Sequence, residues 1–176
     1  FITAALNLED PRKNIFWLVS CLSKVYAQFP KFQVTIVGAF SEKTERFIKH
    51  FLPNASLPGL LPRGELQQLV QSHDVFIFSS LQDDWGYVIP ESLANGLTVL
   101  VPNTHPFYEM VPNEESTYSL SDENDLIIKI MSIMRNTDIV DFKRRHFEFA
   151  EERFSYGSFY KQLNEIYYLS IENGLN

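Results

Sequence analysis

The chain is short of cysteine, of basic runs and of long apolar stretches, and each shortage excludes a class of protein. Its one cysteine, Cys21, lies in a helical apolar pattern, which excludes an internal disulfide framework and fits a reducing compartment. No basic run is longer than Lys143-Arg144-Arg145 and the net charge is −7, so we expect no nucleic-acid partner. No apolar run approaches the roughly 20 residues of a membrane-spanning helix.

What the chain does contain is an alternation of strand-like and helix-like patterns. Strands are expected at residues 2–6, 33–37, 57–61, 75–78, 97–101 and 118–120. Helices are expected at residues 14–29, 44–52, 65–71, 88–95, 125–134, 140–153 and 159–171. The alternation predicts an α/β fold: a doubly wound, Rossmann-like parallel sheet with helices on both faces and extra C-terminal helices. No inner boundary is visible, so residues 1–176 are expected to form a single domain.

The loops that follow the strands are the expected place for a ligand. Doubly wound sheets bind ligands outside the carboxyl ends of their strands. The loops to inspect therefore follow Leu6, Val37, Leu61, Phe78 and Val101.

The densest chemical signal lies in residues 79–96, where a strand end leads through an acidic loop into a helix. The free N–H groups and positive dipole end of that helix suit a phosphate, and Gly86 lets the backbone approach an anion closely. Glu91 lies one turn inside the helix, where its carboxylate can accept hydrogen bonds from a sugar diol such as a ribose. The plainer alternatives stay open: Glu91 as a carboxylate favoured by the helix dipole, and Asp83 and Asp84 as solvated loop residues.

These residues resemble the E-x7-E segment of retaining glycosyltransferases of the GT-B fold, the group 1 or family-4 type. Asp83 stands at the first acidic position and Glu91 at the second, and Trp85 and Gly86 match the aromatic residue and a glycine of the loop between them. Five further segments resemble the family in the same order, at residues 7–14, 34–38, 59–66, 73–80 and 94–101. The resemblance therefore covers nearly the whole chain. It implies that the chain is the C-terminal, donor-binding domain of such a glycosyltransferase.

The resemblance implies a role for each matched residue. Asp83 and Glu91 would be the catalytic positions, and Glu91 would also hold the ribose of the donor. The donor diphosphate would be bound by Arg12, Lys13, Gly86, Tyr87 and Val88. Leu61 and Arg63 belong to the loop that would hold the nucleobase. No metal and no other cofactor is implied, and the four histidines share no metal-ligand spacing.

Three positions depart from the family pattern. Asp83 is one methylene shorter than the usual glutamate, and Asp84 stands where glycine is usual. Many relatives carry the arginine several residues earlier, where this chain has Leu8. Arg12 can therefore point outward, away from the diphosphate.

The implied function is donor binding in a retaining hexosyltransferase that uses a nucleotide diphosphate sugar. The expected partners are that donor, an N-terminal acceptor domain absent from this chain, and a glycan or lipid-linked acceptor, in polysaccharide biosynthesis. Since the chain opens on strand-like residues at Phe1, we expect a piece of a longer protein that is inactive alone. The expected location is cytoplasmic, with peripheral attachment at the inner membrane face left open for the full-length protein.

Two other functions are kept beside this one. The acidic pair Asp83 and Asp84 motivates a non-catalytic, degenerate module that partners another glycosyltransferase. A third possibility is another GT-B enzyme, such as a sugar-nucleotide epimerase. The aromatic residues near the C-terminus are expected to pack between helices, some against the missing domain: Phe154, Tyr156, Phe159, Tyr160, Tyr167 and Tyr168.

Overall fold

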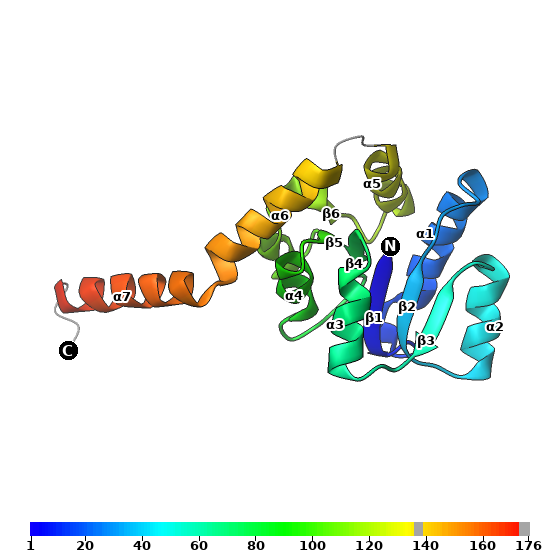
Figure 1. The fold of residues 1–176 in the computed structure, drawn as a ribbon, viewed down its shortest axis with the longest axis horizontal. Helices are drawn as coiled ribbons and strands as arrows, with labels where there is room; N and C mark the ends of the chain where they lie inside the picture. Colours follow the sequence, from blue (N-terminus) through cyan, green and yellow to red (C-terminus); the bar gives the residue numbers. More distant parts are fainter. Residues whose placement is uncertain (136–138, 173–176) are drawn as a thin grey trace.

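The computed structural model describes residues 1–135 and 139–172, with side chains described as far as Glu165. Its centre is a six-stranded sheet in the order β3-β2-β1-β4-β5-β6, and every pair of neighbouring strands is parallel. The strands are β1 (Ile2–Asn7), β2 (Thr35–Ala39), β3 (Ser56–Gly59), β4 (Val75–Ile77), β5 (Thr98–Pro102) and β6 (Thr117–Tyr118). The predicted doubly wound, Rossmann-like sheet is confirmed (Figure 1).

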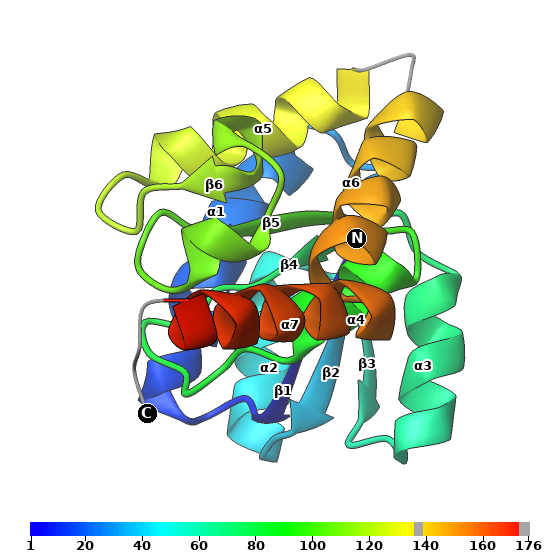
Figure 2. The same ribbon diagram turned by 90° about the vertical axis from the view of Figure 1, so that its left-hand side faces the viewer.

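Helices cover both faces of this sheet, as Figure 2 shows. One face carries α1 (Ile15–Gln28), α2 (Glu42–Phe51) and α5 (Glu123–Arg135). The other carries α3 (Arg63–Gln71), α4 (Val88–Ala94) and α6 (Ile139–Phe154). Three short 3-10 helices that the hydrophobic pattern does not predict are η1 (Pro11–Lys13), η2 (Phe107–Met110) and η3 (Glu114–Ser116).

The buried core divides into two clusters because successive strand residues point to opposite faces. In β4, Val75 and Ile77 join the cluster under α1 and α5, whereas Phe76 joins the cluster under α4. All three residues are buried, which explains why this strand is apolar throughout. Cys21 lies fully buried in α1, as expected of a core residue.

The order of the strands reverses between β1 and β4, and this reversal fixes the place of the site. The chain runs outward from β1 to β3, returns to β4 beside β1, and runs outward to β6. The loops that follow β1 and β4 therefore meet at the carboxyl edge of the sheet. They are joined there by two hydrogen bonds: the Leu81 N–H donates to the Arg12 carbonyl at 2.7 Å, and Ser79 Oγ donates to the Lys13 carbonyl at 2.8 Å.

A buried histidine completes the β5 edge at Val99, because the two-residue β6 pairs only with Val101 and Pro102. The Val99 N–H donates to His146 Nδ1 at 3.2 Å, so Nε2 carries the proton and donates to Ser116 Oγ at 3.1 Å. Ser116 Oγ in turn donates to Asn113 Oδ1 at 3.1 Å. Burial, with a smaller effect from Arg145, lowers the pKa of His146 to about 4. This histidine is therefore a neutral link between α6 and β5.

Helix α7 (Tyr156–Glu172) extends away from the body of the domain (Figure 1). Tyr156, Phe159 and Tyr160 are exposed and do not pack between helices of this chain, and α6 is the main neighbour of α7. Their expected contact with the missing domain stays a prediction. The side chains of Tyr167 and Tyr168 lie outside the described residues. None of the helices, over residues 1–135 and 139–172, has the length and apolar character needed to cross a membrane.

Candidate functional site at the carboxyl edge of the sheet

The loop after β1 is anchored by Leu8 and Glu9 to the end of β2 and the start of α2. Leu8 is fully buried, and its N–H donates to the Ala39 carbonyl at 2.9 Å. The Glu9 carboxylate accepts hydrogen bonds from the Ser41 hydroxyl and amide and, at 2.6 Å, from the Thr44 hydroxyl. These donors lower the pKa of Glu9 to about 2. Because Ser41 caps α2, the loop is fixed to the start of that helix.

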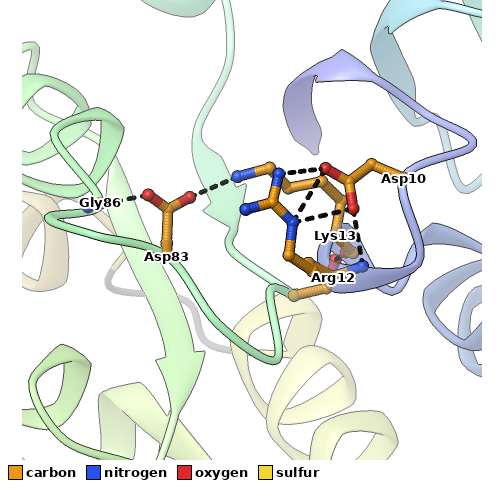
Figure 3. Close-up of polar contacts among 6 residues, drawn as sticks. Asp10, Arg12, Lys13, Asp83 and Gly86 are labelled. Carbon is orange, nitrogen blue, oxygen red and sulfur yellow. Dashed lines mark hydrogen bonds and ion pairs between the residues drawn. The ribbon is translucent and has the colours of Figure 1, made fainter.

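Arg12 is satisfied within its own loop. Asp10 caps η1 by accepting the Arg12 N–H at 2.9 Å, and it also receives the guanidinium, with 2.7 Å between Nη2 and Oδ2. Hydrogen bonds from Arg12 lower the pKa of Asp10. The Arg12 side chain is 62% exposed and folds back on Asp10, as Figure 3 shows. Of the two cations expected at the diphosphate, Arg12 thus faces its own loop and solvent.

Lys13, by contrast, reaches across to the second loop. Its ammonium forms an ion pair with the Asp83 carboxylate, 70 residues away in sequence, and both side chains are partly buried (Figure 3). Partial burial raises the pKa of Asp83, but Lys13 and the amides of Gly86 and Trp85 outweigh that effect, and the net shift is downward. The structure therefore brings together one expected diphosphate ligand and one expected catalytic carboxylate.

Gly86 forms the turn that starts α4. Its φ is +56°, and a Cβ there would lie 3.1 Å from Ile89 Cδ1, so glycine suits both the backbone and the space. The Ile89 N–H donates to the Gly86 carbonyl at 2.8 Å. For the Tyr87 and Val88 amides, the described part of the chain offers no acceptor, which fits their expected role as anion donors. Tyr87 is exposed and stacks on Trp85, with ring centroids 6.4 Å apart.

A second pair of site residues lies beside the first, between α3 and α4. Arg63 Nη2 lies 3.1 Å from Glu91 Oε1, and both side chains are largely exposed, so the pair adds little stability. The pair borders a cavity of about 250 Å³ whose other lining residues are Leu66, Gln67, Val70, Val88, Ser92, Ala94 and Asn95. Ser92 Oγ is buried and has no hydrogen-bond partner among the residues that the structure describes. Leu61 is partly buried and packs under this region against the apolar cluster.

The site residues thus form two groups, Lys13 with Asp83 and Arg63 with Glu91. Sequence reasoning missed Glu9, Ser79 and Leu81, which hold the first group in place, because their partners lie 32 to 69 residues away or are backbone atoms. Asp84 is exposed. Over the described ranges, no three His, Cys, Asp or Glu side chains converge to hold a metal ion.

The sequence matches a known protein family. The model of the family described as glycosyl transferases group 1 matches residues 1–136. A curated relative is the gpi3 subunit of phosphatidylinositol N-acetylglucosaminyltransferase from Schizosaccharomyces pombe. It is 22% identical over 146 residues, which are 80% of this chain and 31% of the relative, so the chain spans about a third of that protein.

Solved structures share the fold. Anabaena Alr3699/HepE, solved in complex with UDP, superposes with a TM-score of 0.76 at 18% identity, over 94% of this chain and 47% of that one. The C-terminal domain of the group 1 glycosyl transferase LpcC from Francisella tularensis superposes with a TM-score of 0.74 at 11% identity, over 88% of this chain and 86% of that domain. The expected resemblance is confirmed. This chain belongs to the glycosyl transferases group 1, and its fold is that of their GT-B domains.

Proposed function

We propose that this domain binds the nucleoside diphosphate part of a sugar donor for a retaining hexosyltransferase. The observation that carries the proposal is the meeting of Lys13, Asp83 and the Tyr87 and Val88 amides where the strand order reverses. A partly buried ammonium and unpaired amides are the donors that a diphosphate requires. The cavity beside Glu91 then lies one helical turn further on, within reach of a nucleoside attached to that diphosphate.

In this proposal the chemistry is electrostatic. When the bond between the anomeric carbon and the donor phosphate oxygen breaks, negative charge develops on the departing diphosphate. Lys13 and the Tyr87 and Val88 amides would stabilise that charge, and Glu91 would hold the ribose so that the anomeric carbon is correctly placed. Asp83 would lie beside the transferred sugar. These groups supply the positive charge at the diphosphate, so no metal ion is proposed.

The relatives support the substrate classes that we propose. HepE is solved with UDP, which supports a nucleoside diphosphate as the shared ligand. The gpi3 relative is a subunit of an N-acetylglucosaminyltransferase named for a phosphatidylinositol, which supports hexosyl transfer to a lipid-linked or glycan acceptor. Since this chain spans 31% of that relative, we propose that a further, N-terminal domain binds the acceptor and completes the active site. Such an enzyme would work in the cytoplasm, with peripheral contact to a membrane.

Calorimetric titration with UDP, GDP and ADP tests donor binding. We expect saturable binding of one of the three nucleotides. Glu91→Ala should weaken it about tenfold, a loss of about 1.4 kcal/mol, because the ribose hydroxyls lose their acceptor. The matched control is Glu65→Ala, which removes an exposed carboxylate from the first turn of α3, outside the cavity, and should leave the affinity unchanged.

A failure of all three nucleotides to bind a folded domain at millimolar concentration would count against a donor site in this chain. Equal weakening by Glu91→Ala and Glu65→Ala would instead show that a specific contact between Glu91 and the ribose does not govern affinity. Circular dichroism of each variant checks that the fold is intact.

One observation favours the alternative, a non-catalytic partner module. The two loops carry four acidic side chains and two basic ones, an unfavourable balance for an anion: Glu9, Asp10, Asp83 and Asp84 against Arg12 and Lys13. Restoring the longer acid by Asp83→Glu in the full-length protein separates the two functions. Transfer activity in either form supports the enzyme, whereas nucleotide binding without transfer in both forms supports the module.

A further inference from the structure

Each basic side chain of the first loop already has an acidic partner, but the two partnerships differ. Arg12 is paired with Asp10, which belongs to the same turn, and the Arg12 side chain is exposed. Lys13 is paired with Asp83 from the other loop, and the two side chains are only 21% and 23% exposed. Ion pairs that are shielded from water interact more strongly than exposed ones, so the pair at Lys13 is the one that matters to an incoming anion.

The two members of this pair are not held equally. Lys13 lies on a loop fixed by buried Leu8 and by the bonds from Glu9 to α2. Asp83 lies beyond Leu81, the last residue whose backbone is tied to the first loop. Its other oxygen receives a long hydrogen bond of 3.4 Å from the Gly86 amide. If the pair separates, Asp83 is therefore the member that moves.

We propose that Asp83 is an internal counter-ion that a diphosphate must displace from Lys13, so that Asp83 sets the affinity of the site for donor and product. This inference rests on the proposed function, since it assigns a role to one residue of the same site. The Lys13 ammonium alternates between two anionic partners, the Asp83 carboxylate and the phosphate oxygens. The displaced carboxylate then lies beside the transferred sugar. After transfer, its return to Lys13 favours release of the nucleoside diphosphate.

The test compares two neighbouring carboxylates that carry the same charge. Asp83→Asn removes the charge next to Lys13, and the amide oxygen can still accept the Gly86 N–H, so the loop turn is retained. Asp84→Asn removes an equal charge from an exposed side chain that does not touch Lys13. For UDP, GDP or ADP measured by calorimetry, we expect Asp83→Asn to tighten the Kd about threefold or more, and Asp84→Asn to change it less than about twofold.

A second comparison uses the Lys13→Gln variant, which lacks the ammonium for which the Asp83 carboxylate and the diphosphate compete. In the Lys13→Gln variant the Asp83→Asn substitution should give no more gain than Asp84→Asn, because no ammonium is left to release. If the parent chain binds a nucleotide but Asp83→Asn binds it equally or more weakly, this inference is overturned and the donor site stands. If the parent does not bind and Asp83→Asn does, the inference is supported directly. If neither binds while both are folded, the inference and the proposed function fail together.

Discussion

The two sides of the sheet that meet at the site are fixed by different means. On the β1–β2 side, the backbones approach so closely at Gly38 that a Cβ would lie 2.2 Å from the Ala5 carbonyl oxygen. On the β4–β6 side, buried polar side chains complete the structure: His146 receives the Val99 amide, and the Tyr118 hydroxyl donates to the Phe78 carbonyl at 2.7 Å.

This difference teaches which perturbation each loop of the site can tolerate. The first loop depends on backbone geometry and on the ionised Glu9 carboxylate, whose pKa is lowered to about 2, so it should resist changes of pH apart from strong acid. The second loop and α4 rest on a side that includes a buried, neutral histidine, so acid should weaken that side first. The stability of one side of the site thus depends on a close backbone approach, and that of the other depends on a histidine that stays neutral. Substitutions and changes of pH can separate the two.

The largest expected effect comes from breaking the steric side. Gly38→Ala would place a Cβ 2.2 Å from the Ala5 oxygen and 2.8 Å from Leu8 Cδ2, at a φ of +152° that L-residues rarely adopt. We expect a loss of about 3 kcal/mol or more in the free energy of unfolding, measured by urea denaturation. The matched control is Gly64→Ala in α3, where a Cβ meets nothing within 4 Å. That substitution should leave stability equal or slightly raised. Equal effects of the two would mean that the close approach is not limiting.

The next effect comes from breaking the polar side with acid. Because the pKa of His146 is lowered from 6.5 to about 4, its contribution is fully present above pH 6.5 and is lost as the pH falls toward 4. The loss should amount to roughly 3 kcal/mol. His73, whose pKa burial also lowers, adds a change of the same sign.

The variant His146→Asn separates this residue from the others. Asparagine keeps an acceptor for the Val99 amide but does not ionise, so the variant should be less stable at pH 7 and lose less on acidification. Urea denaturation at pH 7, 6, 5 and 4.5 measures both slopes. Identical slopes in the parent and the variant would remove His146 as the cause.

A smaller effect should follow from Tyr118→Phe. The substitution keeps the ring that stacks on Trp17, with centroids 5.9 Å apart, and removes only the hydrogen bond to the Phe78 carbonyl. We expect a loss of about 1 kcal/mol in the free energy of unfolding. Tyr26→Phe, on the partly buried side of α1, is the control and should change stability little. A loss as large as that of Gly38→Ala would contradict the expectation that this hydrogen bond contributes less than the close backbone approach at Gly38.

The sequence predicted the fold well because the signals for its elements are local. Strand and helix spacing placed each strand and helix within a few residues of its observed bounds, and the alternation implied the parallel sheet. Helix α2 begins at Glu42, two residues before the expected start, because Ser41 supplies the cap. The order of the strands depends on contacts between distant segments, which apolar spacing does not encode.

The site was predictable only in part, for the same reason. The motif located Asp83, Gly86 and Glu91 because their spacing within one loop and helix is itself the signal. The pairing of Lys13 with Asp83 joins residues 70 positions apart and could not be derived from either segment alone. The aromatic residues at the start of α7 are exposed in this chain, because the helical pattern does not reveal what packs against the helix.

The positions of the two tryptophans have a practical consequence. Trp17 is stacked on buried Tyr118, whereas Trp85 is 65% exposed at the tip of the second loop, two residues from Asp83. Their emission should therefore differ in wavelength and in quenching by iodide, with Trp85 the red-shifted and more readily quenched fluorophore. The loop that we propose to move thus carries its own optical reporter, and the body of the domain carries an internal reference.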